Sequence, residues 1–188
     1  MKTILFSLSV SFLILFSCKQ NCQKKEQEIK TIMKSWYKNK IIFPKNVELL
    51  SLKNLSSKSN SETKIPNLKK YTIVHFFTAD CDKCVNELKL IISSIEKHSE
   101  NNNIDYIFIA SAPTNKYVID AIKETKFPYP IYYEKEYYSF KKMNNLPIND
   151  EVYNTMILNQ NQEVVLFGGF YANEKAQKLF NDVISCGL

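Results

Sequence analysis

The residues of this sequence whose spacing best suits chemistry are two cysteines that two residues separate, in Cys81-Asp82-Lys83-Cys84. A β-rich run ends just before them and an amphipathic helical pattern begins with them, so the pair is expected at a strand-to-helix turn. Both sulfurs can reach bonding distance within one turn there. The first sulfur lies near free N–H groups at the positive end of the helix, which stabilise a thiolate, the species that attacks disulfides. The motif predicts a redox-active pair.

A metal site is the weaker interpretation of the same motif. A structural zinc site needs about four ligands. The chain has five cysteines but a single CxxC spacing, and two histidines. We therefore expect no metal and no other cofactor at the pair. For the distant Cys22 and Cys186, a disulfide and two free thiols remain equally open.

The elements that must position the pair alternate between strand and helix from residue 71 onward. Apolar runs predict strands at residues 47–52, 71–77, 104–110, 130–133, 154–158 and 163–167, with an exposed loop at 54–63. Helical spacing of apolar residues predicts helices at 82–99, 114–125, 136–143 and 173–185. This order predicts an α/β fold with a mixed central β-sheet flanked by helices.

The run from Val74 to Cys84, VHFFTADCDKC, resembles the strand-plus-CxxC signature of the thioredoxin superfamily, and within it the membrane-anchored TlpA-like thiol–disulfide oxidoreductases. The resemblance implies a thioredoxin-like fold over residues 46–188. It also implies that Cys81 is the attacking thiol and Cys84 the resolving thiol. Protein thiols and disulfides would be the substrates.

The sequence departs from the family pattern around the cysteines. Asp80 replaces the usual aromatic residue before the first cysteine, and Asp82-Lys83 replaces Gly-Pro between the two. The charge of Lys83 favours a thiolate, whereas the two aspartates oppose it. The opposing charges therefore leave the reduction potential of the pair open.

His75 stands where the family often has a buried acid or amide beneath the pair. It could shuttle a proton to Cys84 during resolution, since histidine titrates near neutrality. A packed, hydrogen-bonded core histidine is the alternative, and both stay open.

The family also places a cis-proline before the strand that faces the CxxC, a position that falls near Tyr153 here. A cis bond without proline costs about 3 kcal/mol, so a trans bond is expected. The resemblance places the substrate groove at Asp82, Lys83, Tyr153 and Asn154, where the backbone can pair with an extended peptide.

The N-terminus predicts export and a lipid anchor. Residues 1–17 have a short positive start and an apolar core too short to span a bilayer, which is typical of a signal peptide. Leu15-Phe16-Ser17-Cys18 resembles the lipobox of bacterial lipoproteins, which implies acylation of Cys18. We expect a cell-envelope protein that is anchored to a membrane and faces an extracytoplasmic compartment. The outer membrane is favoured over the inner membrane as the site of the anchor. A plain secretory signal with a coincidental cysteine is the alternative.

Residues 18–45 are predicted to form a tether and an amphipathic helix that ends at Pro44. The apolar stripe of this helix is expected to pack on the core, with a partner-docking face as the alternative; it comprises Ile29, Ile32, Met33, Trp36 and Tyr37.

The charge pattern argues against nucleic acid as a partner. The formal net charge is +6, but all 25 basic residues are lysine and none is arginine. Arginine supplies the planar, bidentate contacts that such sites favour. Two functions from different classes remain: an anchored thiol–disulfide oxidoreductase, and a thioredoxin-like binding or assembly module in which the Cys81–Cys84 bond is only structural.

Overall fold

The computed structural model describes residues 21–53, 55, 62–63, 65, 68–98 and 104–188. The predicted signal peptide at 1–17 and the predicted acylation site Cys18 lie outside these residues. Among the described residues, no helix is both long and apolar enough to cross a membrane.

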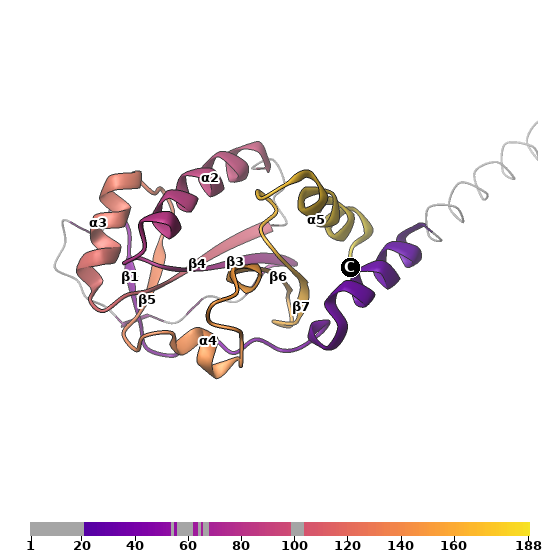
Figure 1. The fold of residues 1–188 in the computed structure, drawn as a ribbon, viewed down its shortest axis with the longest axis horizontal. Coiled ribbons are helices and arrows are strands. Elements are labelled where there is room, and N and C mark those ends of the chain that lie inside the picture. Colours follow the sequence, from indigo (N-terminus) through magenta and orange to yellow (C-terminus); the bar gives the residue numbers. More distant parts are fainter. Residues whose placement is uncertain (1–20, 54, 56–61, 64, 66–67, 99–103) are drawn as a thin grey trace, which may run out of the picture.

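A mixed sheet of seven strands forms the centre of the described part of the chain (Figure 1). Its order is β2 (Glu62–Thr63), β1 (Val47–Leu50), β5 (Ile131–Glu134), β4 (Ile104–Ser111), β3 (Tyr71–Thr78), β6 (Thr155–Asn159) and β7 (Val164–Phe167). The three middle strands β5, β4 and β3 are parallel, and the outer strands pair antiparallel. The predicted mixed α/β sheet is confirmed.

Helices cover both faces of this sheet. On one face lie α2 (Asp82–His98), α3 (Asn115–Thr125) and α5 (Glu174–Cys186), and on the other lies α4 (Ser139–Met143) (Figure 1). The strands β3, β4 and β5 follow one another across the sheet, so the connections α2 and α3 lie on the same side, as right-handed crossovers require. Two short 3₁₀ turns, η1 (Lys34–Trp36) and η2 (Glu151–Asn154), are also present.

The strand β3 lies in the middle of the core. Seven of its eight residues are buried, as expected of a strand covered on both faces. Phe76 points toward α4 and stacks on Phe140 with ring centroids 6.1 Å apart. His75 belongs to the opposite face, where its ring lies 6.1 Å from that of Tyr171. The strand is therefore fixed from both sides up to the residue where the cysteine turn begins.

The N-terminal helix, described from residue 21 to 33, packs on the domain. Ile29 and Met33 are buried in the main core, whereas Ile32 is 48% exposed and does not belong to the packed stripe. Cys22 forms a disulfide with Cys186 at the end of α5, which settles the alternative left open by the sequence. Lys25 also forms an ion pair with the buried Asp182 of α5.

Several predicted boundaries are wrong. The N-terminal helix gives way to η1 after residue 33 instead of continuing to Pro44, and β1 ends at Leu50. The predicted loop at 54–63 contains the short strand β2, which pairs with β1. The helix α4 starts at Ser139 rather than at residue 136, because Tyr138 adopts a left-handed conformation (φ 61°) that a helix cannot include.

Candidate functional site

The cysteine turn is built by the end of β3 and the start of α2. Ala79 closes the strand by donating its backbone N–H to the carbonyl of Ser111 on β4 at 2.9 Å. Two residues later the carbonyl of Cys81 accepts the N–H of Val85 at 3.0 Å, which begins the helical hydrogen-bonding pattern. Cys81 thus lies at the N-terminal edge of α2, where free N–H groups are concentrated, as predicted.

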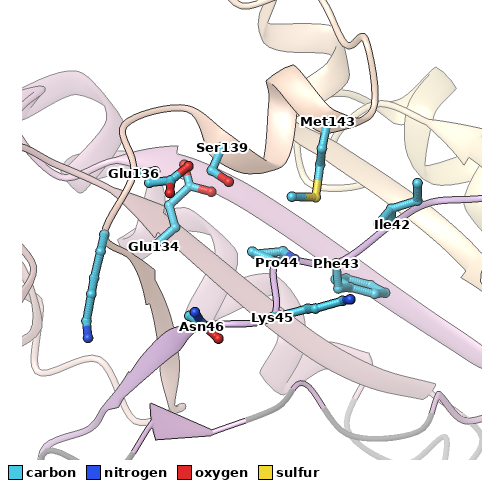
Figure 2. Close-up of a pocket in the computed structure, with 10 residues that line it drawn as sticks. Ile42, Phe43, Pro44, Lys45, Asn46, Glu134, Glu136, Ser139 and Met143 are labelled. Carbon is cyan, nitrogen blue, oxygen red and sulfur yellow. The ribbon is translucent and has the colours of Figure 1, made fainter.

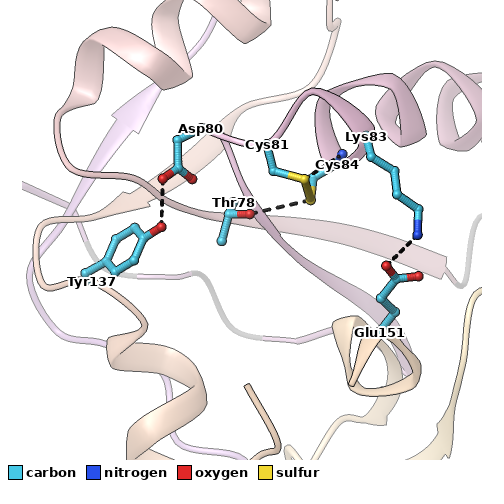
Figure 3. The surroundings of a disulfide bond; sticks show 7 residues. All are labelled: Thr78, Asp80, Cys81, Lys83, Cys84, Tyr137 and Glu151. Atoms are coloured by element: carbon cyan, nitrogen blue, oxygen red, sulfur yellow. Dashed lines mark hydrogen bonds and ion pairs between the residues drawn. A yellow bond between two sulfur atoms is a disulfide. The ribbon is translucent and has the colours of Figure 1, made fainter. Parts of the chain in front are cut away.

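The two sulfurs form a disulfide, with their Cα atoms 5.2 Å apart. The backbone N–H of Cys84 points at the Cys81 sulfur, 3.3 Å away, and the hydroxyl of Thr78 donates to the Cys84 sulfur at 3.5 Å (Figure 3). Both cysteines are half-buried, so the contrast between an accessible Cys81 and a shielded Cys84 is not visible in the oxidised pair. The amide contact on Cys81 is the one that would stabilise a thiolate there.

The charged residues of the motif have partners of their own. Lys83 pairs with Glu151 of η2 at 2.6 Å, and both side chains are largely exposed (Figure 3). The hydrogen bond and the charge of Glu151 raise the pKa of Lys83. The carboxylate of Asp80 accepts the hydroxyl of Tyr137 at 2.8 Å. Because Glu151 offsets the charge of Lys83, this lysine supports a Cys81 thiolate less than the sequence suggests.

The predicted groove residues Tyr153 and Asn154 lie in η2, directly before β6. The Asp150 side chain caps this turn by accepting the N–H of Val152 at 3.0 Å. The ring of Tyr153 contacts Phe167 at 4.8 Å and Trp36 at 5.7 Å between centroids. No described peptide bond is cis, so the bonds around Tyr153 are trans, as expected. The Lys83–Glu151 pair connects this turn to the cysteine motif.

His75 is 1% exposed, and its Nδ1 lies 2.8 Å from the hydroxyl oxygen of Thr155. These two residues are direct partners across β3 and β6, which places their side chains on the same face. Burial lowers the pKa of His75 to about 3, so the ring is neutral at neutral pH. Its Nε2 is buried and has no hydrogen-bond partner among the described residues.

Sequence reasoning missed three polar residues that connect His75 to the surface. The hydroxyl of Tyr171 lies 3.0 Å from the Thr155 oxygen and donates to the carboxylate of Glu87 on α2 at 2.7 Å. Burial and the charge of Glu87 raise the pKa of Tyr171. The position of Glu87, three residues after Cys84 on the same helical face, was the one available signal. Tyr171 lies in an irregular segment after β7 with no pattern of its own.

A separate pocket of about 370 Å³ lies beside α4 (Figure 2). Its lining comes from the segment 42–46 and from the neighbourhood of β5 and α4, and it includes Phe43, Pro44, Glu134, Ser139 and Met143. Burial raises the pKa of Glu134 to about 7, although the hydrogen bond that its carboxylate accepts from the Phe140 N–H lowers this pKa. None of the predicted site residues lines this pocket. In the described part of the chain, no three acidic, histidine or cysteine side chains come together as metal ligands.

No protein-family model matches the chain, and no curated protein matches it either. Solved structures do match its fold. A thioredoxin-like protein in its oxidised form is similar with a TM-score of 0.55 and 11% identity over 80% of this chain and 98% of that one. The thioredoxin domain of a thiol-disulfide oxidoreductase from Bacteroides vulgatus is similar with a TM-score of 0.51 and 14% identity, over 73% of this chain and 97% of that one. A Chlorobium tepidum protein assigned as the thiol:disulfide interchange protein DsbE is similar with a TM-score of 0.56 and 8% identity, over 82% of this chain and 100% of that one. These likenesses show a thioredoxin-like fold.

Proposed function

We propose that this chain is a thiol–disulfide oxidoreductase that exchanges disulfides with protein thiols through Cys81 and Cys84. The observation that carries the proposal is the half-buried disulfide at the N-terminal edge of α2, with the Cys84 N–H directed at the Cys81 sulfur. The same fold carries thiol–disulfide oxidoreductases among its structural neighbours. An amide at this distance favours negative charge on Cys81 over Cys84 once the pair is reduced.

The exchange follows from the unequal surroundings of the two sulfurs. The Cys81 thiolate attacks one sulfur of a partner disulfide, a mixed disulfide forms, and one partner sulfur leaves as a thiolate that takes a proton from water. Cys84 then loses its proton and attacks the Cys81 sulfur. The mixed disulfide breaks, the second partner sulfur leaves, the partner is reduced by two electrons and the cysteine pair is oxidised. The reverse sequence oxidises a partner dithiol.

Trapping the intermediate tests this mechanism. In Cys84→Ser the mixed disulfide on Cys81 cannot be resolved, so partner proteins should accumulate as covalent adducts, visible on non-reducing gels of cell-envelope extracts. Cys81→Ser is the matched control and should trap few, because Cys84 lacks the amide contact. If neither variant captures a partner and the wild type exchanges no model disulfide, the proposal fails.

The binding-module alternative has two observations in its favour. The peptide bonds around Tyr153 are trans, where redox-active family members have a cis-proline, and the charge of Lys83 is offset by that of Glu151. The reduction potential separates the two functions. A value below about −300 mV would fit a structural bond, whereas a higher value fits an exchanging pair.

We further propose that the protein works outside the cytoplasm on a lipid anchor at Cys18, on the outer membrane. The support is the lipobox-like sequence together with the Cys22–Cys186 disulfide, since disulfides persist in oxidising compartments. Cys18→Ala should move the protein from the membrane fraction to a soluble or unprocessed form. Incorporation of labelled palmitate into that variant would overturn the anchor.

A further inference from the structure

The polar residues around His75 form one connected chain of hydrogen bonds. His75 Nδ1 lies 2.8 Å from Thr155 Oγ1, which lies 3.0 Å from the Tyr171 hydroxyl, which lies 2.7 Å from Glu87 Oε1. The Tyr171 hydroxyl is also 3.4 Å from Nδ1. The chain runs from a fully buried ring to a half-buried carboxylate on α2.

The carboxylate fixes the direction of every bond in this chain. An ionised carboxylate only accepts, so the Tyr171 proton is donated to Glu87. The Tyr171–Thr155 contact must then use the Thr155 proton. The oxygen of Thr155, having donated its proton, can only accept from Nδ1. Any other assignment leaves one of these close contacts without a hydrogen between its two atoms.

We infer that Glu87, Tyr171 and Thr155 are positioning residues that hold His75 in the tautomer with its proton on Nδ1, so that Nε2 is kept as a buried acceptor for the Cys84 thiol of the reduced pair. This inference rests on the proposed function and deepens it. A hydrogen bond to one ring nitrogen sets which nitrogen is protonated, and Nε2 is buried without any hydrogen-bond partner among the described residues.

The placement of the chain under α2 supports Cys84 as the donor. Glu87 follows Cys84 by three residues, so the two side chains lie on the same side of the helix. Cys84 itself contacts Thr78 at the end of β3, the strand that also carries His75. The helix α2 covers the face of the sheet that carries His75, and it reaches β3 at Cys84 and the chain of hydrogen bonds at Glu87 (Figure 1). During resolution, the Cys84 thiol would donate a hydrogen bond to Nε2, and because burial keeps the ring neutral, the proton goes on to water as the Cys84 sulfur attacks Cys81.

The tautomer can be measured without reference to activity. The chain has two histidines, so a His98→Gln background leaves His75 as the only imidazole. Long-range ¹H–¹⁵N spectra of the full-length protein distinguish the two neutral tautomers, and Nδ1 should be the protonated nitrogen. In the reduced protein the Nε2 signal should differ from that of Cys84→Ala, which lacks the thiol.

Thr155→Val removes the bond to Nδ1 and should mix the two tautomers, and Thr155→Ser should restore the Nδ1–H form. Thr72→Val is the matched control, since Thr72 is also buried in the sheet but its hydroxyl has no partner among the described residues. In stopped-flow exchange, Thr155→Val should slow resolution about tenfold and leave attack by Cys81 unchanged.

An Nε2–H tautomer in the wild type would overturn the inference, as would a Thr155→Val spectrum or resolution rate equal to that of Thr72→Val. An Nε2 signal that is the same in reduced wild type and Cys84→Ala would also overturn it. These results differ from failure of the proposed function, in which the wild type exchanges no disulfide whatever the tautomer of His75.

Discussion

His75 and Glu134 are buried ionisable residues whose pKa values move in opposite directions. Burial lowers the pKa of His75 to about 3 and raises that of Glu134 to about 7. Between pH 4.5 and 6.5, the unfolded chain therefore carries a proton on His75 and none on Glu134. The native protein carries a proton on Glu134 and none on His75. The two differences cancel in the number of protons bound on unfolding.

We predict that removing either residue reveals the contribution of the other. In Glu134→Gln, His75 remains, and the free energy of unfolding should rise with pH between 4.5 and 6.5, relative to wild type, by up to about 1.4 kcal/mol per pH unit. In His75→Gln, Glu134 remains, and the free energy should fall by a similar slope as pH rises toward 7. Urea unfolding of the oxidised protein at pH 4.5, 5.5 and 6.5 measures both slopes.

Other carboxylates contribute equally to wild type and variants, so the comparison isolates the two residues. Parallel pH profiles for wild type and Glu134→Gln would show that this carboxyl is ionised in the native state throughout the range. That result would contradict the prediction that burial keeps the Glu134 carboxyl protonated in the native protein.

At the scale of elements, the sequence predicts best where apolar periodicity is strong. The strand β3 and the helix α2 were predicted within one residue of their observed ends, because a continuous apolar run and a helical stripe flank the cysteine turn. The location of Cys81 and Cys84 at this turn can therefore be predicted from the sequence. The turn η2 was not predicted, since its capping by Asp150 depends on a single polar side chain.

The surroundings of the cysteine pair were harder to predict than the pair itself. Glu151 reaches Lys83 over a separation of 68 residues, and Tyr171 reaches Glu87 over 84. Such contacts depend on strand order and register, which place β6 and its flanking segments beside β3. Neither periodicity nor a local motif contains that information. The residues that contact the site from distant parts of the sequence can therefore be identified only from the folded structure.

At the scale of the molecule, the Cys22–Cys186 disulfide joins the two ends of the described chain. It closes a separation of 164 residues. Cross-linking so long a loop restricts the unfolded chain, and the loop-entropy model gives about 5 kcal/mol of stabilisation.

We predict that the double variant Cys22→Ser/Cys186→Ser is destabilised by about 3 to 5 kcal/mol in urea unfolding. The Cys81–Cys84 disulfide closes only a short loop, so Cys81→Ser/Cys84→Ser is the matched control and should lose much less. Equal losses in the two double variants would show that the long cross-link adds little to the stability of the fold.

The same cross-link changes the connectivity of the polypeptide. Between residues 22 and 186 the backbone and the disulfide together form a closed ring, so one cut in the backbone opens the ring without separating it into two molecules. A protease that nicks a surface loop would leave a protein of unchanged mass, apart from one added water, until a reductant divides it. The fragments on either side of a nick would thus remain attached to whatever holds the N-terminus.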